Sequence, residues 1–493
     1  MYLFNVSLQC ILSYQVDTLK EKTARGLLWS GLSGGVQKTL NLLFGIILAR
    51  LLTQSDYGMV GLLAIFSEIA GTLQEGGFIN ALNRRKNICN ADYNSVFWFS
   101  TLTGLALYVL LFLSAPLIAS FYGIEELTAL ARYVFLGFLI TSFGIASRAY
   151  VFHNLMVRES AIISVSALTV SCCIGIAMAA NGFSYWGIAT QSIVYNLIST
   201  GANIMIARWR PSLNIDFQPV REMFGFSSRL VLTTLVNIAK ANFFPIILGK
   251  LFSPYDVGNY TQANKWNFMG WSTIANMCNS VGQPVFARTA DDRTRQLRIL
   301  RKLLRFTAFL AFPAMFGLGI VSHELIVILL TERWAEAADL LRWLCIAGAF
   351  LSISTVFINL LVSHGRSDIY MWGSIALSVL MLPGMIVAAF YGIGAMTVVY
   401  VIIHIIETGL WFWFVRRETG LTLANMLSDL SPYLLLSLAL AAVTLAIASP
   451  ITSIYLRLVV KVVVMSTSYC IILWVLRSEI FLESINYCFK RRK

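Results

Sequence analysis

Long apolar stretches separated by short polar turns make up almost the whole chain. A membrane-spanning helix needs roughly 20 mainly apolar residues. Fourteen stretches are candidates for such helices: 27–52, 57–81, 95–121, 128–155, 160–181, 183–207, 224–251, 257–285, 300–322, 335–362, 369–390, 392–415, 430–449 and 454–476. Because hydrocarbon offers no partner to backbone groups, each stretch must satisfy its own amides and carbonyls as a helix. The pattern predicts an all-α integral membrane protein with about fourteen transmembrane helices.

One helix–turn–helix sequence occurs twice, two hundred residues apart. GIILARLLTQSDYG ends at Gly58 and PIILGKLFSPYDVG ends at Gly258, with Asp56 and Asp256 at matching places. We expect each Asp to cap the second helix, its carboxylate accepting from the first free amides. Both copies join the first two apolar stretches of their half of the chain. The repeat therefore predicts two halves built by doubling one helical bundle.

Composition agrees with a membrane protein, since the chain is 58% hydrophobic and 12% charged, against about 25% charged residues in soluble domains. The net charge of +13 could suggest nucleic-acid binding, but Lys and Arg are concentrated in alternate connections. That distribution orients a membrane protein and places both termini in the cytoplasm, with basic loops facing anionic lipids. We expect residues 1–26 to be a cytoplasmic segment, with no signal peptide in residues 1–16, and residues 477–493 to be a basic cytoplasmic tail.

Several charged residues lie inside the apolar stretches, where each costs about 2.5–3.5 kcal/mol if it faces lipid. We therefore expect most of them to face a common interior. These residues are Lys38, Glu68, Glu75, Arg148, Arg229, Lys240 and Lys265.

Their spacing suggests roles. Arg229 and Lys240 share one helical stripe that carries no acid, which predicts a cationic lumen for an anionic, phosphate-bearing ligand. Glu68 and Glu75 share a face and are candidates for coupling an ion gradient. Lys38 and Glu68 both reach the middle of the bilayer and can pair, either to order helix packing or to serve transport. Arg148 lies near the end of its stretch, so it can line the lumen or extend to the inner headgroups.

No enzyme motif is present. The chain has no Walker loop, no G-x-S-x-G and no H-E-x-x-H, and its eight Cys residues show no metal-binding spacing. His404 and Glu407, three residues apart, can either relay protons or simply pack. We therefore expect no catalytic residue, metal site or cofactor.

Several separated segments resemble one family. The run LKEKTARGLLWSGLSGGVQKTLNLLFGIILARLLTQSDYGMVGL, which begins at Leu19, is similar to the opening of the Wzx-type polysaccharide transporters of the MOP superfamily, particularly the colanic-acid-exporter-like members. GFINALNRRKN, SPYDVGNYTQANKW, TERWAEAADLLRWL and HGRSD agree with it further along. The resemblance extends over essentially the whole chain from Leu19 onward, except the last dozen residues.

The resemblance implies a lipid-linked oligosaccharide flippase of the bacterial inner membrane. It implies an N-lobe of six helices (27–207), a cytoplasmic linker (208–223), a pseudo-twofold-related C-lobe (224–415) and two extra helices (416–476). An undecaprenyl-pyrophosphate-linked glycan would cross by alternating access, driven by an ion gradient and working beside membrane lipids and the polysaccharide polymerase and chain-length machinery. Its pyrophosphate would meet the five cations named above: Lys38, Arg148, Arg229, Lys240 and Lys265.

Three other functions remain open. A multidrug or cation antiporter of the same superfamily needs a lumen dominated by acids, which the excess of cations disfavours. A membrane glycosyltransferase or polymerase needs outer loops with catalytic acids or Arg, and these are missing. A passive scaffold would leave the buried charges unexplained.

Overall fold

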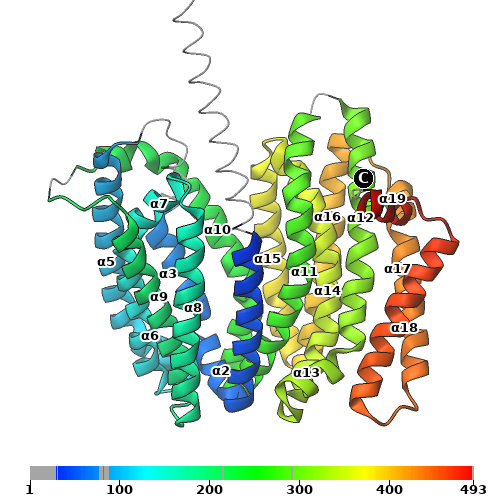
Figure 1. Cartoon of the computed structure of the whole chain (residues 1–493), viewed down its shortest axis with the longest axis horizontal. Coiled ribbons are helices and arrows are strands. Elements are labelled where there is room, and N and C mark those ends of the chain that lie inside the picture. The colour runs from blue at the N-terminus through cyan, green and yellow to red at the C-terminus, as the bar shows by residue number, and fades with distance from the viewer. Residues whose placement is uncertain are drawn as a thin grey trace, which may run out of the picture. The chain divides into compact units, whose positions relative to one another are not determined.

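A computed structural model of the chain describes residues 29, 31–76, 82, 88–213, 216–289 and 292–490. Within these ranges, the side chains of residues 222–230, 233, 484–485 and 487–490 lie outside the description. Every regular element among the described residues is a helix (Figure 1). The all-α prediction is therefore confirmed for this part of the chain.

Contacts divide the chain into two compact units, Met1–Ala239 and Lys240–Lys493. Unit 1 contains the helix Gly31–Leu51 and the helices α2 (Gln54–Gly61), α3 (Ala64–Glu75), α5 (Asn90–Tyr122), α6 (Leu127–Ser142), α7 (Ile145–His153), α8 (Val157–Ala180) and α9 (Trp186–Ile206). The boundary falls inside α10 (Gln218–Leu251). Within unit 1, α6 packs against both α5 and α9, and α9 packs against α8 (Figure 1).

Unit 2 is built around α14 (Ala335–Ser363), which packs against α11 (Pro254–Arg288), α12 (Arg293–Ile320) and α16 (Ile393–Thr419) (Figure 1). Its other elements are α13 (Ser322–Leu330), the 3₁₀ helix η1 (Glu332–Trp334), α15 (Ser367–Ala389), α17 (Leu423–Ala448), α18 (Ile454–Val475) and α19 (Glu479–Lys490). Within its membrane-length stretch α14 is the most buried of the apolar helices, because its many Ala, Gly and Ser residues let neighbouring helices approach closely.

Each of the fourteen ranges in which the sequence predicts a span contains helix in its described residues. Ten of the described helices are long and apolar enough to cross a membrane, and a bent pair, α6 with α7, makes an eleventh candidate. The helices α9, α10 and α11 are long but fall outside this apolar set. The protein is a multi-pass membrane protein, while the number fourteen stays a prediction.

The repeated helix–turn–helix forms the same cap in both units. Thr53 and Ser253 are the N-caps, and Asp56 and Asp256 stand at the third helical position of a capping box. The Asp56 carboxylate accepts from the Thr53 amide at 2.8 Å, and the Asp256 carboxylate accepts from the Ser253 amide at 3.1 Å. The expectation that the Asp itself is the N-cap is wrong, because the preceding hydroxyl residue takes that place and the Asp closes the box behind it.

The two glycines of the repeat are buried inside the second helix of each copy rather than in the turn. Gly58 lies in α2 and Gly258 in α11, each two residues after its Asp. Pro254 is the first residue of α11, where its missing amide hydrogen costs nothing. The turn itself is therefore shorter than the sequence indicates.

The predicted span 128–155 is broken into α6 and α7, which meet at an angle of 47°. Gly144 lies at the break, and a Cβ there would come within 3.0 Å of the Thr200 side chain on α9. The absence of a side chain thus lets α9 pack close to the bend. Arg148 follows one turn later on α7, so the bend determines its direction.

Most of the predicted basic tail is the helix α19, which packs against the rest of unit 2. Glu479 and Glu483 of α19 form ion pairs with Arg305 (3.2 Å) and Lys302 (2.6 Å) of α12.

The helices α17 and α18 are joined to neighbouring helices by ion pairs. Asp429 accepts from Arg301 at 2.7 Å, and Lys461 donates to Glu324 at 2.6 Å.

Candidate functional site

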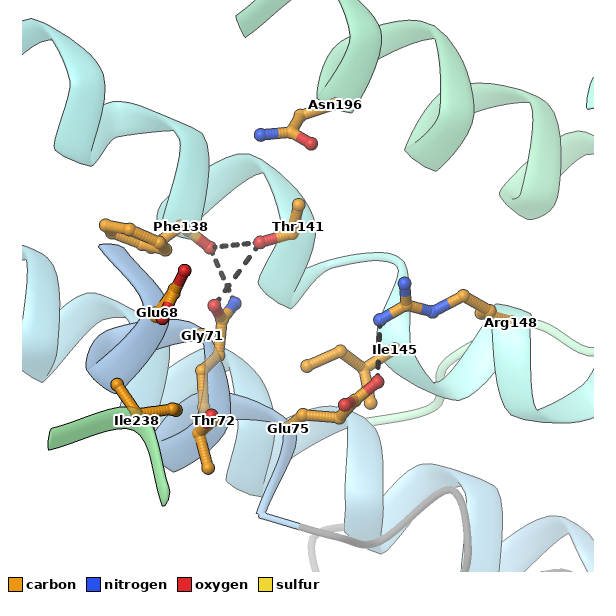
Figure 2. Close-up of a pocket in the computed structure, with 11 residues that line it drawn as sticks. Glu68, Gly71, Thr72, Glu75, Phe138, Thr141, Ile145, Arg148, Asn196 and Ile238 are labelled. Carbon is orange, nitrogen blue, oxygen red and sulfur yellow. Dashed lines mark hydrogen bonds and ion pairs between the residues drawn. The ribbon is translucent and has the colours of Figure 1, made fainter. Parts of the chain in front are cut away.

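A cavity of about 410 Å³ inside unit 1 collects three of the predicted site residues (Figure 2). Glu68 and Glu75 approach it from α3, seven residues apart on one face, and Arg148 approaches it from α7. Glu75 is the last residue of α3, because Gly76 adopts a left-handed conformation and ends the helix. The prediction that the two glutamates share a face is confirmed.

Arg148 and Glu75 form an ion pair of 3.0 Å. Their side chains are 52% and 44% exposed, so the pair is accessible from the cavity and can exchange partners. Glu68 is exposed as well. Among the described residues no ion pair joins Glu68 to Lys38, and Lys38 is exposed on its own helix. The possible Lys38–Glu68 pair is therefore not formed in this structure.

Gln74 fixes the wall of the cavity and was not singled out in the sequence. It is 2% exposed, its Nε2 donates to the carbonyl of Phe138 at 2.6 Å, and its Oε1 accepts from Thr141 at 3.3 Å. These bonds tie α3 to α6 and so hold both neighbouring glutamates in place (Figure 2). An amide side chain inside a predicted membrane span, directly before Glu75, was the signal that could have found it.

Lys240 belongs to a different cluster, inside unit 2. Its ammonium donates to Glu407 on α16 at 2.5 Å, and the same carboxylate is bonded to His404 Nδ1 (2.7 Å) and to Trp411 Nε1 (3.2 Å). The Lys240 and Glu407 side chains are only 13% and 4% exposed. Lys240 has no acid on its own stripe, as its sequence spacing indicates, but Glu407 on another helix supplies an acidic partner.

The remaining predicted cations are not joined to either cluster by a described contact. Lys265 is half-buried on α11, and the Arg229 side chain lies outside the described residues. Of the five predicted cations, Arg148 alone lines the cavity that holds the glutamates, as far as the structure is described. A lumen lined by all five stays a prediction.

The cavity chemistry is that of a mixed charge site. Two carboxylates and one guanidinium face the same water-accessible space. A guanidinium offers a planar fork that matches a phosphate oxygen pair. A carboxylate next to it competes for that fork, and it ceases to compete once it is protonated. The site can therefore bind an anion and a proton together, or release both.

Two solved structures have a fold similar to that of this chain. The chain matches a lipid II flippase, MurJ, in an inward closed conformation, with a TM-score of 0.73 and 15% identity over 91% of this chain and 99% of that one. It also matches an inward-facing multidrug resistance MATE family transporter of the MOP superfamily, with a TM-score of 0.63 and 16% identity over 78% of this chain and 94% of that one. At such identities the likeness concerns the fold alone.

Curated relatives with similar sequences are named for polysaccharide biosynthesis. The lipopolysaccharide biosynthesis protein WzxC of Escherichia coli strain K12 is 24% identical, with 82% of this chain and 83% of the relative covered. The succinoglycan biosynthesis transport protein ExoT of Rhizobium meliloti strain 1021 is 22% identical, with 85% and 83% covered. Residues 47–339 match the sequence model of a protein family that is described as polysaccharide biosynthesis protein. This match extends over more than half of the chain, which therefore belongs to the polysaccharide biosynthesis protein family.

Proposed function

We propose that the protein is a flippase that moves an undecaprenyl-pyrophosphate-linked oligosaccharide from the inner to the outer leaflet of the bacterial inner membrane, for surface polysaccharide synthesis. Family membership and the names of the relatives support this function. The observation that carries it is Arg148, a half-exposed guanidinium in a cavity between membrane-length helices. Such a group is costly in a bilayer unless an anionic ligand or an acid meets it.

Arg148 would bind the pyrophosphate by exchanging partners. Glu75 holds the guanidinium at 3.0 Å in this structure. A phosphate oxygen needs the same fork, so the two anions compete. Protonation of Glu75 would remove its competition with phosphate for the Arg148 guanidinium. Glu68 lines the same cavity and is a second proton acceptor. Uptake of a proton is thereby linked to uptake of the lipid pyrophosphate, which is the coupling we propose for the ion gradient.

The remaining parts of the proposal follow from charge placement and from the family. Both termini are cytoplasmic, because Lys and Arg are concentrated in the connections on that side. The protein is not an enzyme. It works beside the polymerase and chain-length machinery that use the flipped glycan. Lys38, Arg229, Lys240 and Lys265 remain candidates for further contacts with the anionic substrate.

The test is flipping of a labelled undecaprenyl-pyrophosphate oligosaccharide in proteoliposomes that hold the full chain. Arg148→Gln should lower the initial rate about tenfold, a change of about 1.4 kcal/mol in the barrier. Arg132→Gln is the matched control, since the Arg132 guanidinium lies over the Phe112 ring, 4.4 Å from its centroid, rather than in the cavity. Equal rates for the wild type and the Arg148 variant would reject this site.

A multidrug or cation antiporter is the second candidate, because the cavity sets two carboxylates against one guanidinium. In that case a cationic dye would replace a proton at Glu68. Export of ethidium by cells that express the protein, abolished by Glu68→Gln and unaffected by a lipid-linked glycan, would favour this function. Glycan flipping without dye export would exclude it.

A further inference from the structure

A second cavity inside unit 1 has a different chemical character. It measures about 500 Å³, within the roughly 300–1,000 Å³ typical of ligand sites. Six helices line it: Gly31–Leu51, α2, α3, α6, α8 and α9. Phe138 and Asn196 line this cavity and the one that holds Arg148, so the two adjoin each other (Figure 2).

The described lining of this second cavity is polar but uncharged. Eight of its fourteen residues carry an amide or a hydroxyl, and none is Asp, Glu, Lys, Arg or His. The residues that matter most are Gln37 and Asn41 of the first helix, Ser67 of α3, and Gln191, Tyr195 and Asn196 of α9. Sites for apolar drugs are lined mainly by hydrophobic side chains, so this lining does not fit one. A charged group would find no counter-ion there.

Most of these polar groups have no protein partner. In the described part of the chain, the side chains of Asn41, Ser67, Tyr195 and Asn196 make no hydrogen bond to another protein group, and all four residues are at least partly accessible. Polar side chains between membrane-length helices are costly unless they are hydrogen-bonded. Amides and hydroxyls both donate and accept hydrogen bonds. Sugar hydroxyls do the same, so the two sets of groups can bond to each other. Tyr195 adds an apolar ring face with a polar tip.

We propose that this cavity is the subsite for an uncharged sugar of the lipid-linked glycan, next to the charged cavity that takes its pyrophosphate. This assignment rests on the proposed flippase function. The residues that line each cavity determine which part of the substrate it binds. In the charged cavity, the guanidinium of Arg148 binds the anion. In the uncharged cavity, Asn41, Tyr195 and Asn196 form hydrogen bonds with neutral sugar hydroxyls. Substrates whose first sugars are neutral should fit, and a sugar with a carboxylate at this position should be excluded because it would lose its hydration without gaining a cation.

Binding to the purified full chain in detergent tests the proposal with two probes. One is undecaprenyl pyrophosphate, and the other is the same lipid with a neutral hexose disaccharide. We expect the wild type to bind the sugar-bearing lipid about tenfold more tightly. Asn41→Leu and the milder Tyr195→Phe should each remove much of this difference and leave affinity for the bare lipid unchanged. Ser114→Ala is the control, since the Ser114 hydroxyl donates to the Leu111 carbonyl of its own helix and does not line the cavity.

A fourth variant probes the geometry rather than the polar groups. A Cβ at Gly137 would lie 2.9 Å from Asn196 Nδ2, so Gly137→Ala must displace that amide. It should weaken sugar-dependent binding without removing any hydrogen-bonding group. The proposal is overturned if the wild type binds both lipids equally, or if the variants weaken both probes alike. Sugar-dependent binding without any flipping would reject the proposed function and retain the sugar site. Flipping without sugar-dependent binding would retain the proposed function and reject the sugar site.

Discussion

The ion pair Arg148–Glu75 in unit 1 and the ion pair Lys240–Glu407 in unit 2 both join a predicted cation to a glutamate, and they differ in their access to water. Arg148 and Glu75 in unit 1 are about half exposed and line a cavity. In unit 2, Lys240 is nearly buried and Glu407 is buried, and His404 and Trp411 also bond to the Glu407 carboxylate. The first pair can open to a ligand at little cost. The second is surrounded by its own partners and serves to hold helices together.

The physical reason lies in desolvation. A pair in contact with water contributes about 0–1 kcal/mol to stability, because water replaces each partner when the pair opens. A buried pair loses water on both groups, so removing one partner leaves an uncompensated charge. Arg148 is therefore better placed than Lys240 to exchange its partner for a substrate, because Lys240 would first have to leave a nearly buried pair.

The largest effect is expected from Glu407→Leu. Because it leaves the Lys240 ammonium buried without an acid, we expect the free energy of unfolding to fall by about 3–5 kcal/mol. Thermal unfolding of the purified protein in detergent measures this change. The double variant Lys240→Met with Glu407→Leu removes both charges and should recover most of the loss. If the single and double variants unfold alike, the pair does not hold the unit together.

A smaller effect is expected from Lys461→Met in unit 2. Lys461 and Glu324 are 8% and 2% exposed, but Arg457 also lies 3.9 Å from the Glu324 carboxylate. Arg457 can compensate part of the charge that Lys461 leaves behind, so we expect a loss of about 2 kcal/mol. The same unfolding measurement applies. A loss as large as that of Glu407→Leu would show that Arg457 gives no compensation.

The capping boxes should give effects of about 1 kcal/mol, within the range of roughly 0.5–2 for lost caps. Asp56→Ala should cost more than Asp256→Ala, because Asp56 also accepts a hydrogen bond from Ser184 of the loop before α9. Unfolding of the two variants side by side compares the two copies of one motif. Equal losses would mean that the Ser184 contact adds nothing.

The smallest change in stability is expected from Arg148→Gln. Because the ion pair with Glu75 is half exposed, its loss should change the free energy of unfolding by less than about 1 kcal/mol. Flipping should nevertheless fall about tenfold, as proposed above. A variant that loses both stability and flipping in proportion would place Arg148 with the structural pairs, beside Lys240.

Sequence patterns predicted the features that are local in the chain. The apolar periodicity located the helices, and the repeat located the turns at Asp56 and Asp256, although it did not show which residue caps. Partners from other helices were not predictable in this way. Glu407 lies 167 residues from Lys240, and helical spacing relates a residue only to neighbours within its own helix. The bend at Gly144 was missed because a glycine in an apolar run does not by itself show how closely another helix approaches.

Sequence separation also imposes an order on biosynthesis. The cap formed by Thr53 and Asp56 lies within four residues, so it is complete almost as soon as its segment leaves the ribosome. Glu407 follows Lys240 by 167 residues, which takes about 8 s even at roughly 20 residues per second. During that interval the nascent α10 carries a lysine whose eventual partner has not been made. Insertion of α10 must therefore wait until α16 has been made. Otherwise, the translocation machinery or lipid headgroups must keep the Lys240 ammonium solvated until then.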